Sequence, residues 1–146
     1  MAGYGRQRPA GWFYAVAAAL VLWGAMGVFA FYSDISMSDA ARAALSDYDR
    51  QLLASRPAWF IYLYGIATWS GLLGSIALIA RRAWAYPLYI VSLIASVAMF
   101  GYIFAVTDLI AVKGAGETLP FPILIIAIAI FQLWLAGRAR QRGWIA

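Results

Sequence analysis

Few side chains in this sequence are of types that carry out chemistry. The residue types that are missing restrict what that chemistry could be. The chain of 146 residues contains no cysteine and no histidine. Thiol redox relays, iron–sulfur ligation and histidine-based haem or zinc sites are therefore excluded, as is acid–base catalysis by histidine. The sequence also has no glycine-rich phosphate loop. We predict no catalytic residue, no metal site and no cofactor.

The polar and aromatic residues inside the apolar stretches are the first candidates for a ligand site. Gln132 and Ser75 lie at similar depths in two such stretches, and a hydrogen bond between membrane helices contributes ~0.6 to 2 kcal/mol. Trp23 and Trp69 lie near the middle of their stretches, where anchoring at the membrane interface does not explain them. They either line a pocket for an apolar headgroup such as a quinone or lipid, or fill the core with a bonded indole N–H.

Two adjacent arginines, Arg81 and Arg82, interrupt the apolar sequence. A cation close to an anionic leaflet gains ~1 kcal/mol, so we expect both to bind anionic lipid headgroups, together with Arg138 and Arg140. A phosphate or nucleotide site is the alternative. The residues expected to anchor the following helix at the interface are Trp84, Tyr86 and Tyr89.

The composition defines the elements that position these residues. The hydrophobic fraction is 65% and the charged fraction 12%, against ~45–50% and ~25% in soluble domains. A membrane-spanning helix needs ~20 apolar residues, and backbone groups in lipid must be paired within the segment. The apolar stretches run from about 12–32, 59–80, 84–106 and 120–137. We predict a single all-α domain, an integral membrane four-helix bundle whose first span is not a cleaved signal peptide.

The charges predict the orientation of this bundle. Both tails and the loop between the second and third spans carry arginines and no acid, whereas the other two loops carry all six acidic residues. The positive-inside rule then places both termini in the cytoplasm of a multi-pass protein of the bacterial inner membrane. Since the net charge of +5 lies at membrane edges, we expect no nucleic-acid partner. The arginines that carry this prediction are Arg6, Arg8, Arg81, Arg82, Arg138, Arg140 and Arg142.

Small residues at helical spacing predict how the spans pack. Such residues let backbones approach closely, which is how helices associate in lipid. The faces expected at these contacts are Ala67, Gly71, Gly74, Ser75 and Leu78 in the second span, Ser92 and Ser96 in the third, Gly24 and Gly27 in the first, and Ala129, Gln132 and Ala136 in the fourth.

The loops that hold the acids also have structure of their own. Ser38 and Ser46 are good N-caps, and they predict short helices at about 39–45 and 47–55 in the first outer loop. Tyr48 and Leu52 share one face of the second helix, which should rest on the membrane or the bundle. After the third span, no helix breaker occurs before Gly114. The third helix is therefore expected to continue to about 113.

Asp108 lies just beyond the third span, where an unpaired carboxylate would be partly desolvated. Arg56 is held close to the membrane by Pro57 and Trp59. We predict an Asp108–Arg56 contact that fastens the first outer loop over the bundle. The functional alternative is that Asp108 guards an entrance for a cationic or hydroxylated solute.

Several stretches resemble a family of small four-helix bacterial inner-membrane proteins, mostly uncharacterised and in part labelled sugar transporters. The similar stretches, which span nearly the whole chain, are LWGAMGVFAF, MSDAARAALS, GLLGSIALIARRAWAYPLY, VSLIASV and RGW. These are anchor and packing residues, so the resemblance implies a fold and no catalytic role.

These features favour a non-enzymatic accessory or interaction subunit of a membrane assembly. Its expected partners are the lipid bilayer, anionic lipids at the cytoplasmic face, and another membrane protein or further copies of the chain. The alternative is a small-solute, possibly sugar, transporter acting as an oligomer. An enzyme or quinone-binding redox subunit is the third class.

Overall fold

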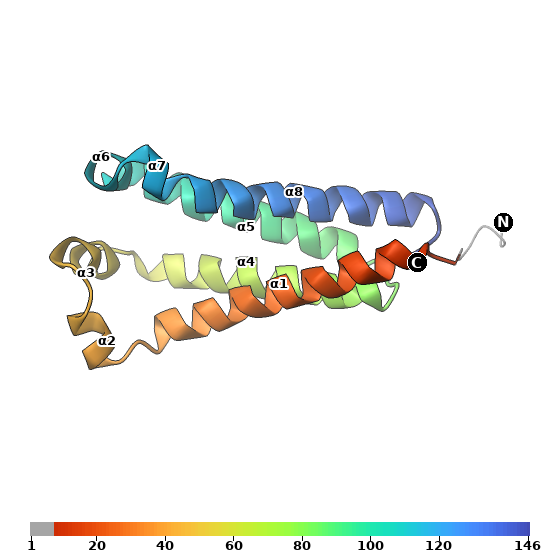
Figure 1. The fold of residues 1–146 in the computed structure, drawn as a ribbon, viewed down its shortest axis with the longest axis horizontal. Coiled ribbons are helices and arrows are strands. Elements are labelled where there is room, and N and C mark those ends of the chain that lie inside the picture. The colour runs from red at the N-terminus through yellow and green to blue at the C-terminus, as the bar shows by residue number, and fades with distance from the viewer. Residues whose placement is uncertain (1–7) are drawn as a thin grey trace.

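Four long helices dominate the computed structural model, which describes residues 8–146 (Figure 1). Each is long and apolar enough to cross a membrane, which confirms the all-α four-helix bundle. Arg6 lies outside the described residues. The long helices are α1 (Gly11–Ile35), α4 (Ala58–Ile79), α5 (Ala85–Val106) and α8 (Pro120–Gln141).

The bounds of α4 and α5 agree with the predicted spans to within one residue, whereas α1 and α8 are longer at their C-terminal ends. Helix α1 continues through Asp34. Helix α8 continues through Arg138 and Arg140, which lie in its last turn. Cations are favourable there because the C-terminal end of a helix carries partial negative charge. Both extensions add charged residues to the ends of apolar helices.

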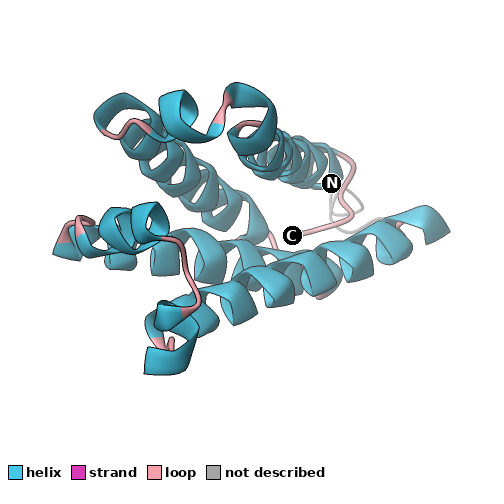
Figure 2. Cartoon of the chain, turned by 60° about the vertical axis from the view of Figure 1, so that its left-hand side comes forward, coloured by secondary structure: helices cyan, strands magenta, loops and turns pink. Residues whose placement is uncertain are grey.

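The long helices pack in the order α1, α4, α5 and α8, each chiefly against its neighbours in this order (Figure 2). Glycine makes two of these contacts possible. A Cβ atom on Gly24 would lie 2.8 Å from Cα of Leu72, and one on Gly74 would lie 2.9 Å from the ring of Tyr89. Apart from the half-buried Gly27, the predicted contact faces are all buried, which confirms packing through small residues.

The start of α1 and the C-terminus lie at one end of the bundle, together with the loop between α4 and α5 (Figure 1). We call this the arginine end, after Arg81, Arg82, Arg138, Arg140 and Arg142. Helix α4 stops there in a Schellman motif: the amide of Arg81 donates to the carbonyl of Leu78 (3.0 Å) and that of Arg82 to Ala77 (2.8 Å). Arg81 adopts a φ of 62°, a conformation that costs a side-chain-bearing residue ~1–2 kcal/mol.

The opposite end is covered by short helices, which we call the cap (Figure 1). The hydroxyl of Ser38 accepts the amide of Ala41 and that of Ser46 accepts the amide of Asp49, each at 3.1 Å. These N-caps confirm the two helices predicted between the first two spans. The helices of the cap are α2 (Asp39–Ala43), α3 (Asp47–Ala54), α6 (Leu109–Lys113) and α7 (Ala115–Thr118).

The prediction that the third helix continues to residue 113 is wrong. Helix α5 ends at Val106, Thr107 is extended with a ψ of 163°, and a separate helix, α6, follows. The Thr107 hydroxyl donates to the carbonyl of Ile103, and such local side-chain bonds compete with helix continuation. Gly114, with a φ of 87°, ends α6 as expected. The break keeps α6 and α7 within the cap.

Candidate functional site

The centre of the cap is an ion pair between Asp34, in the last turn of α1, and Arg56, just before α4. Nη1 of Arg56 lies 2.9 Å from Oδ2 of Asp34, and the two side chains are only 19% and 20% exposed. The guanidinium also lies 5.1 Å from the centroid of the buried Phe60 ring, a favourable cation–π contact. Asp34, Arg56 and Phe60 therefore tie the ends of α1 and α4 together.

The predicted Asp108–Arg56 contact is wrong, because Arg56 is engaged by Asp34. The carboxylate of Asp108 instead accepts a hydrogen bond of 2.7 Å from the Tyr48 hydroxyl. Burial and this bond raise the pKa of Tyr48 to about 12. Tyr48 of α3 thus contacts the segment between α5 and α6, and Leu52 lines a cavity together with Tyr102 of α5. That this face rests on the membrane or the bundle stays a prediction.

A second ion pair joins α3 to α6. Nζ of Lys113 lies 2.7 Å from Oδ1 of Asp49. The hydrogen bond from Lys113 is the main reason that the pKa of Asp49 lies below its usual value, and the same bond raises the pKa of Lys113. The Tyr48–Asp108 and Asp49–Lys113 contacts together hold α3 against the segment that follows α5.

Two cavities adjoin the Asp34–Arg56 pair. One, of about 310 Å³, lies among the ends of α1 and α4 and the helices α2 and α3; the other, of about 250 Å³, lies beneath α3 against α5. Asp34, Leu53 and Arg56 line both cavities. The ion pair therefore stands between them.

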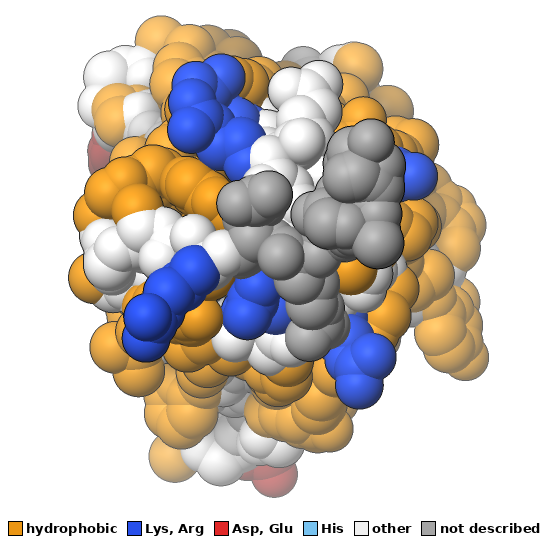
Figure 3. Space-filling model, turned by 90° about the vertical axis from the view of Figure 1, so that its right-hand side faces the viewer, with side chains coloured by type: hydrophobic (Ala, Val, Ile, Leu, Met, Phe, Trp, Pro, Cys, Tyr) orange, Lys and Arg blue, Asp and Glu red, His pale blue; other side chains and the backbone are white. Residues whose placement is uncertain are grey.

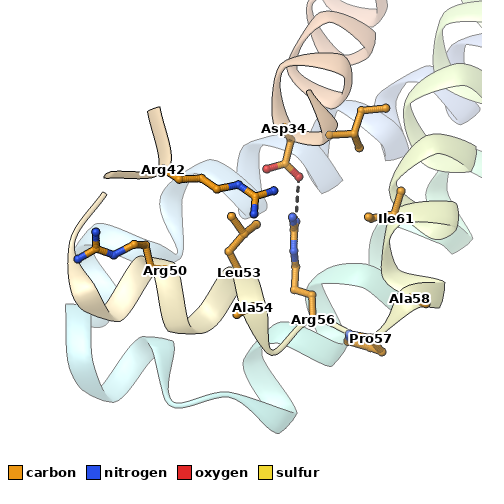
Figure 4. Close-up of a pocket in the computed structure, with 10 residues that line it drawn as sticks. Asp34, Arg42, Arg50, Leu53, Ala54, Arg56, Pro57, Ala58 and Ile61 are labelled. Carbon is orange, nitrogen blue, oxygen red and sulfur yellow. Dashed lines mark ion pairs between the residues drawn. The ribbon is translucent and has the colours of Figure 1, made fainter. Parts of the chain in front are cut away.

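The first cavity also receives Arg42 and Arg50 (Figure 4). Arg50 pairs with Asp47 and points away from Asp34, whereas the guanidinium of Arg42 points toward Asp34 (Figure 4). Arg42 makes no ion pair or hydrogen bond with any residue that the structure describes. The cavity thus combines one paired arginine at its centre with one arginine that has no counter-ion.

Gln132 and Ser75, which their similar depths would allow to meet, form no hydrogen bond with each other. The Ser75 hydroxyl lies 3.0 Å from the carbonyl of Gly71 and 2.8 Å from the hydroxyl of Tyr89. Gln132 is buried, at 3% exposed, but it belongs to α8, which packs against α5 and not extensively against α4. Tyr89 is itself fully buried, so its expected role as an interface anchor is wrong.

The two mid-span tryptophans do not line either cavity of the cap. Trp69 is 37% exposed and meets Tyr32 edge-on, with 6.3 Å between ring centroids. The prediction that Trp69 fills the bundle core is therefore wrong. Trp23 is half-buried. The headgroup pocket stays a prediction for both residues.

At the arginine end, Arg81 has a structural role that the sequence did not indicate. Its Nε donates to the carbonyl of Trp144 (2.9 Å), and its own carbonyl accepts the amide of Ala146 (3.1 Å). The amide of Ala83 donates to the carbonyl of Ala146 (3.0 Å). The C-terminal segment is thereby fixed to the hairpin between α4 and α5, which offsets the strained φ of Arg81.

The arginines at the end of α8 lie over aromatic rings. Arg138 lies 5.9 Å from the ring centroid of Trp134, and Arg140 lies 5.7 Å from that of Tyr86. Basic side chains gather on this face among apolar ones (Figure 3). Binding of anionic headgroups by Arg81, Arg82, Arg138 and Arg140 stays a prediction.

Sequence reasoning missed Asp34 and Tyr89. Asp34 follows the predicted first span as closely as Asp108 follows the third, so the same criterion would have found it. Tyr89 lies one turn inside α5 and was expected only as an anchor; its contact with Gly74 is made to another helix and leaves no local signal in the sequence. Neither residue brings a metal site with it: no cluster of three or more potential ligands occurs in residues 8–146.

Comparisons with protein-family models, with curated protein sequences and with solved structures find no match. The resemblance to a family of small bacterial membrane proteins therefore stays a prediction.

Proposed function

We propose that this integral membrane protein is a non-enzymatic accessory subunit of an assembly in the bacterial inner membrane, with both termini in the cytoplasm. The observation that carries the proposal is the apolar interior between the cap and the arginine end. No charged residue lies in the middle of any long helix. Charged groups are costly in hydrocarbon, and pumps and transporters keep them there for function.

Three of the buried serine hydroxyls, those of Ser70, Ser75 and Ser92, are bonded within the protein. Ser70 donates to the carbonyl of Ile66, and Ser92 donates 2.8 Å to the carbonyl of Ala67. Ser75 is bonded to Gly71 and Tyr89. Because these groups are occupied by protein partners, a single chain is suited to binding at its surfaces more than to moving a polar solute.

Helices α1 and α8, the first and last in the packing order, supply surfaces for a partner subunit. Helices α1 and α8 each pack extensively against one long helix only. Large apolar side chains on both are exposed, including Met26 and Phe29 on α1 and Phe131 and Trp134 on α8. In the membrane these side chains contact either lipid or another protein.

A small-solute transporter, possibly for a sugar, is the second candidate. It is favoured by the two cavities beside the Asp34–Arg56 pair, which provide a place for a solute at the cap end. Further copies of the chain would have to complete a path, since one copy offers none.

Purification from native membranes tests the proposal. We expect a second membrane protein to co-purify with the wild type in fixed stoichiometry. One of two double variants, Met26→Ala/Phe29→Ala or Phe131→Ala/Trp134→Ala, should lose this partner, and the other should retain it. The variant that retains the partner is the matched control. Uptake of a sugar by the purified chain in liposomes, with no partner bound, would instead establish the transporter.

A further inference from the structure

We infer that the cap cavity lined by Arg42, Arg56 and Asp34 is a binding site for an oxyanion, a phosphate or carboxylate group. The site is separate from the exposed residues proposed for a partner, Met26 and Phe29 on α1 and Phe131 and Trp134 on α8, and it does not depend on the accessory role.

The balance of charge in the cavity is the first argument. Three arginines and a single acid, Asp34, line it. Asp34 pairs with Arg56, and Arg50 is neutralised by Asp47. Arg42 therefore leaves one uncompensated positive charge that points toward the pair (Figure 4). A second anion between Arg42 and Arg56 would balance it.

The geometry of Arg56 is the second argument. Nη1 of Arg56 is at ion-pair distance from Oδ2 of Asp34, but both Oδ2 of Asp34 and Nε of Arg56 are buried with no hydrogen-bond partner in the part of the chain that the structure describes. A buried N–H without a partner costs about 1–3 kcal/mol. Guanidinium groups bind carboxylates and phosphates through paired N–H donors, so an oxyanion on Arg56 would remove this cost.

The remaining walls indicate what the anion is attached to. Ile35, Leu53, Pro57 and Ile61 give the cavity apolar walls, and Ile35 and Ile61 belong to the ends of spanning helices. A volume of about 310 Å³ holds a phosphate together with part of a linked group. Both a lipid phosphate and a free oxyanion have the required chemistry.

Protection of Arg42 from phenylglyoxal, read by peptide mass spectrometry, tests the inference in the intact protein. In dodecyl maltoside micelles, which contain no phosphate, we titrate inorganic phosphate, and in a separate arm we add phosphatidylglycerol. We expect saturable protection of Arg42, severalfold or more, in at least one arm. Phosphate protection identifies a free oxyanion, and protection by phosphatidylglycerol alone identifies a lipid phosphate. Arg50 in the same digest is the control and should change little.

Two variants decide whether Arg56 shares the ligand. Asp34→Asn removes the competing carboxylate, so the midpoint of protection should shift severalfold to lower concentration. Arg56→Gln should shift it at least tenfold higher or abolish protection. The inference is overturned by no saturable protection of Arg42 in either arm, by equal protection of Arg42 and Arg50, or by an Asp34→Asn midpoint equal to or weaker than wild type.

Discussion

Asp34, at the C-terminal end of α1, is paired at 2.9 Å with Arg56, which directly precedes Pro57 and α4. The contact closes the base of the loop that carries α2 and α3. It sets the position of α3, from which Tyr48 and Asp49 reach the segment that follows α5. One ion pair thus links the first two membrane helices to the rest of the cap.

Because both side chains are about four-fifths buried, loss of either partner should lower the free energy of unfolding by about 1–3 kcal/mol. We expect Asp34→Asn and Arg56→Gln to be non-additive when combined, as measured by thermal unfolding in detergent. The control cycle, Asp108→Asn with Arg56→Gln, should be additive. Coupling between Asp108 and Arg56, with none between Asp34 and Arg56, would show that Arg56 contacts Asp108 instead.

Tyr89→Phe should destabilise the bundle by about 1 kcal/mol, because it removes the hydroxyl that bonds Ser75 in the core. The effect should be non-additive with Ser75→Ala in the same unfolding assay. Gln132→Leu combined with Ser75→Ala should be additive, since the two residues do not bond. If Gln132 and Ser75 prove coupled, α8 lies closer to α4 than the structure has it.

Attachment of α3 to α6 should depend on pH. The lowered pKa of Asp49 means that its contribution is present above its unfolded value of 3.8 and is lost as pH falls through the lower folded value. The raised pKa of Lys113 means that its contribution is present below 10.5 and is lost as pH rises through the higher folded value. The distance between spin labels at the exposed residues Gln51 of α3 and Ala111 of α6 should therefore stay constant from about pH 5 to 9 and lengthen at both the acid and the alkaline extreme.

Lys113→Gln is the control for this pH dependence. It removes the main cause of the Asp49 shift, so the acid transition should move toward pH 3.8. An unchanged transition in Lys113→Gln would show that another group controls the attachment.

Gly24→Ala should destabilise the contact of α1 with α4 by about 1–3 kcal/mol, as overpacking does. The added methyl would lie 2.8 Å from a backbone atom of Leu72, so the helices would have to separate. Gly101→Ala is the matched control, because nothing lies within 4 Å of its added Cβ. A stability of Gly24→Ala equal to that of Gly101→Ala would mean that the two helices are not in close contact.

The spans, the N-caps and the small-residue faces were predictable because each depends on local sequence: apolar length, a capping hydroxyl, or spacing on one helix. The partners of Asp34, Tyr48 and Tyr89 were not, because each lies on another element. In sequence alone Arg56 could pair with Asp34 or Asp108, and only the path of the loop decides. The break at Thr107 was missed because threonine is tolerated within helices as well as at their ends.

The end of α4 at the arginine end was also not predictable from local sequence. Gly143 marks the end of α8 in sequence, but Arg81 takes the equivalent left-handed position in α4 without a glycine. What makes that conformation tolerable is the set of bonds to the C-terminal segment. This long-range contact leaves no local pattern.

The central claim is that the cap and the arginine end lie on opposite sides of the membrane, with the arginines in the cytoplasm. Since the chain has no cysteine, single cysteines report this directly with a membrane-impermeant maleimide in intact cells. We expect Gly116→Cys to label in intact cells and Arg82→Cys to label only after permeabilisation. Labelling of Arg82→Cys in intact cells would contradict the orientation, and labelling of both would show that the chain inserts in two directions.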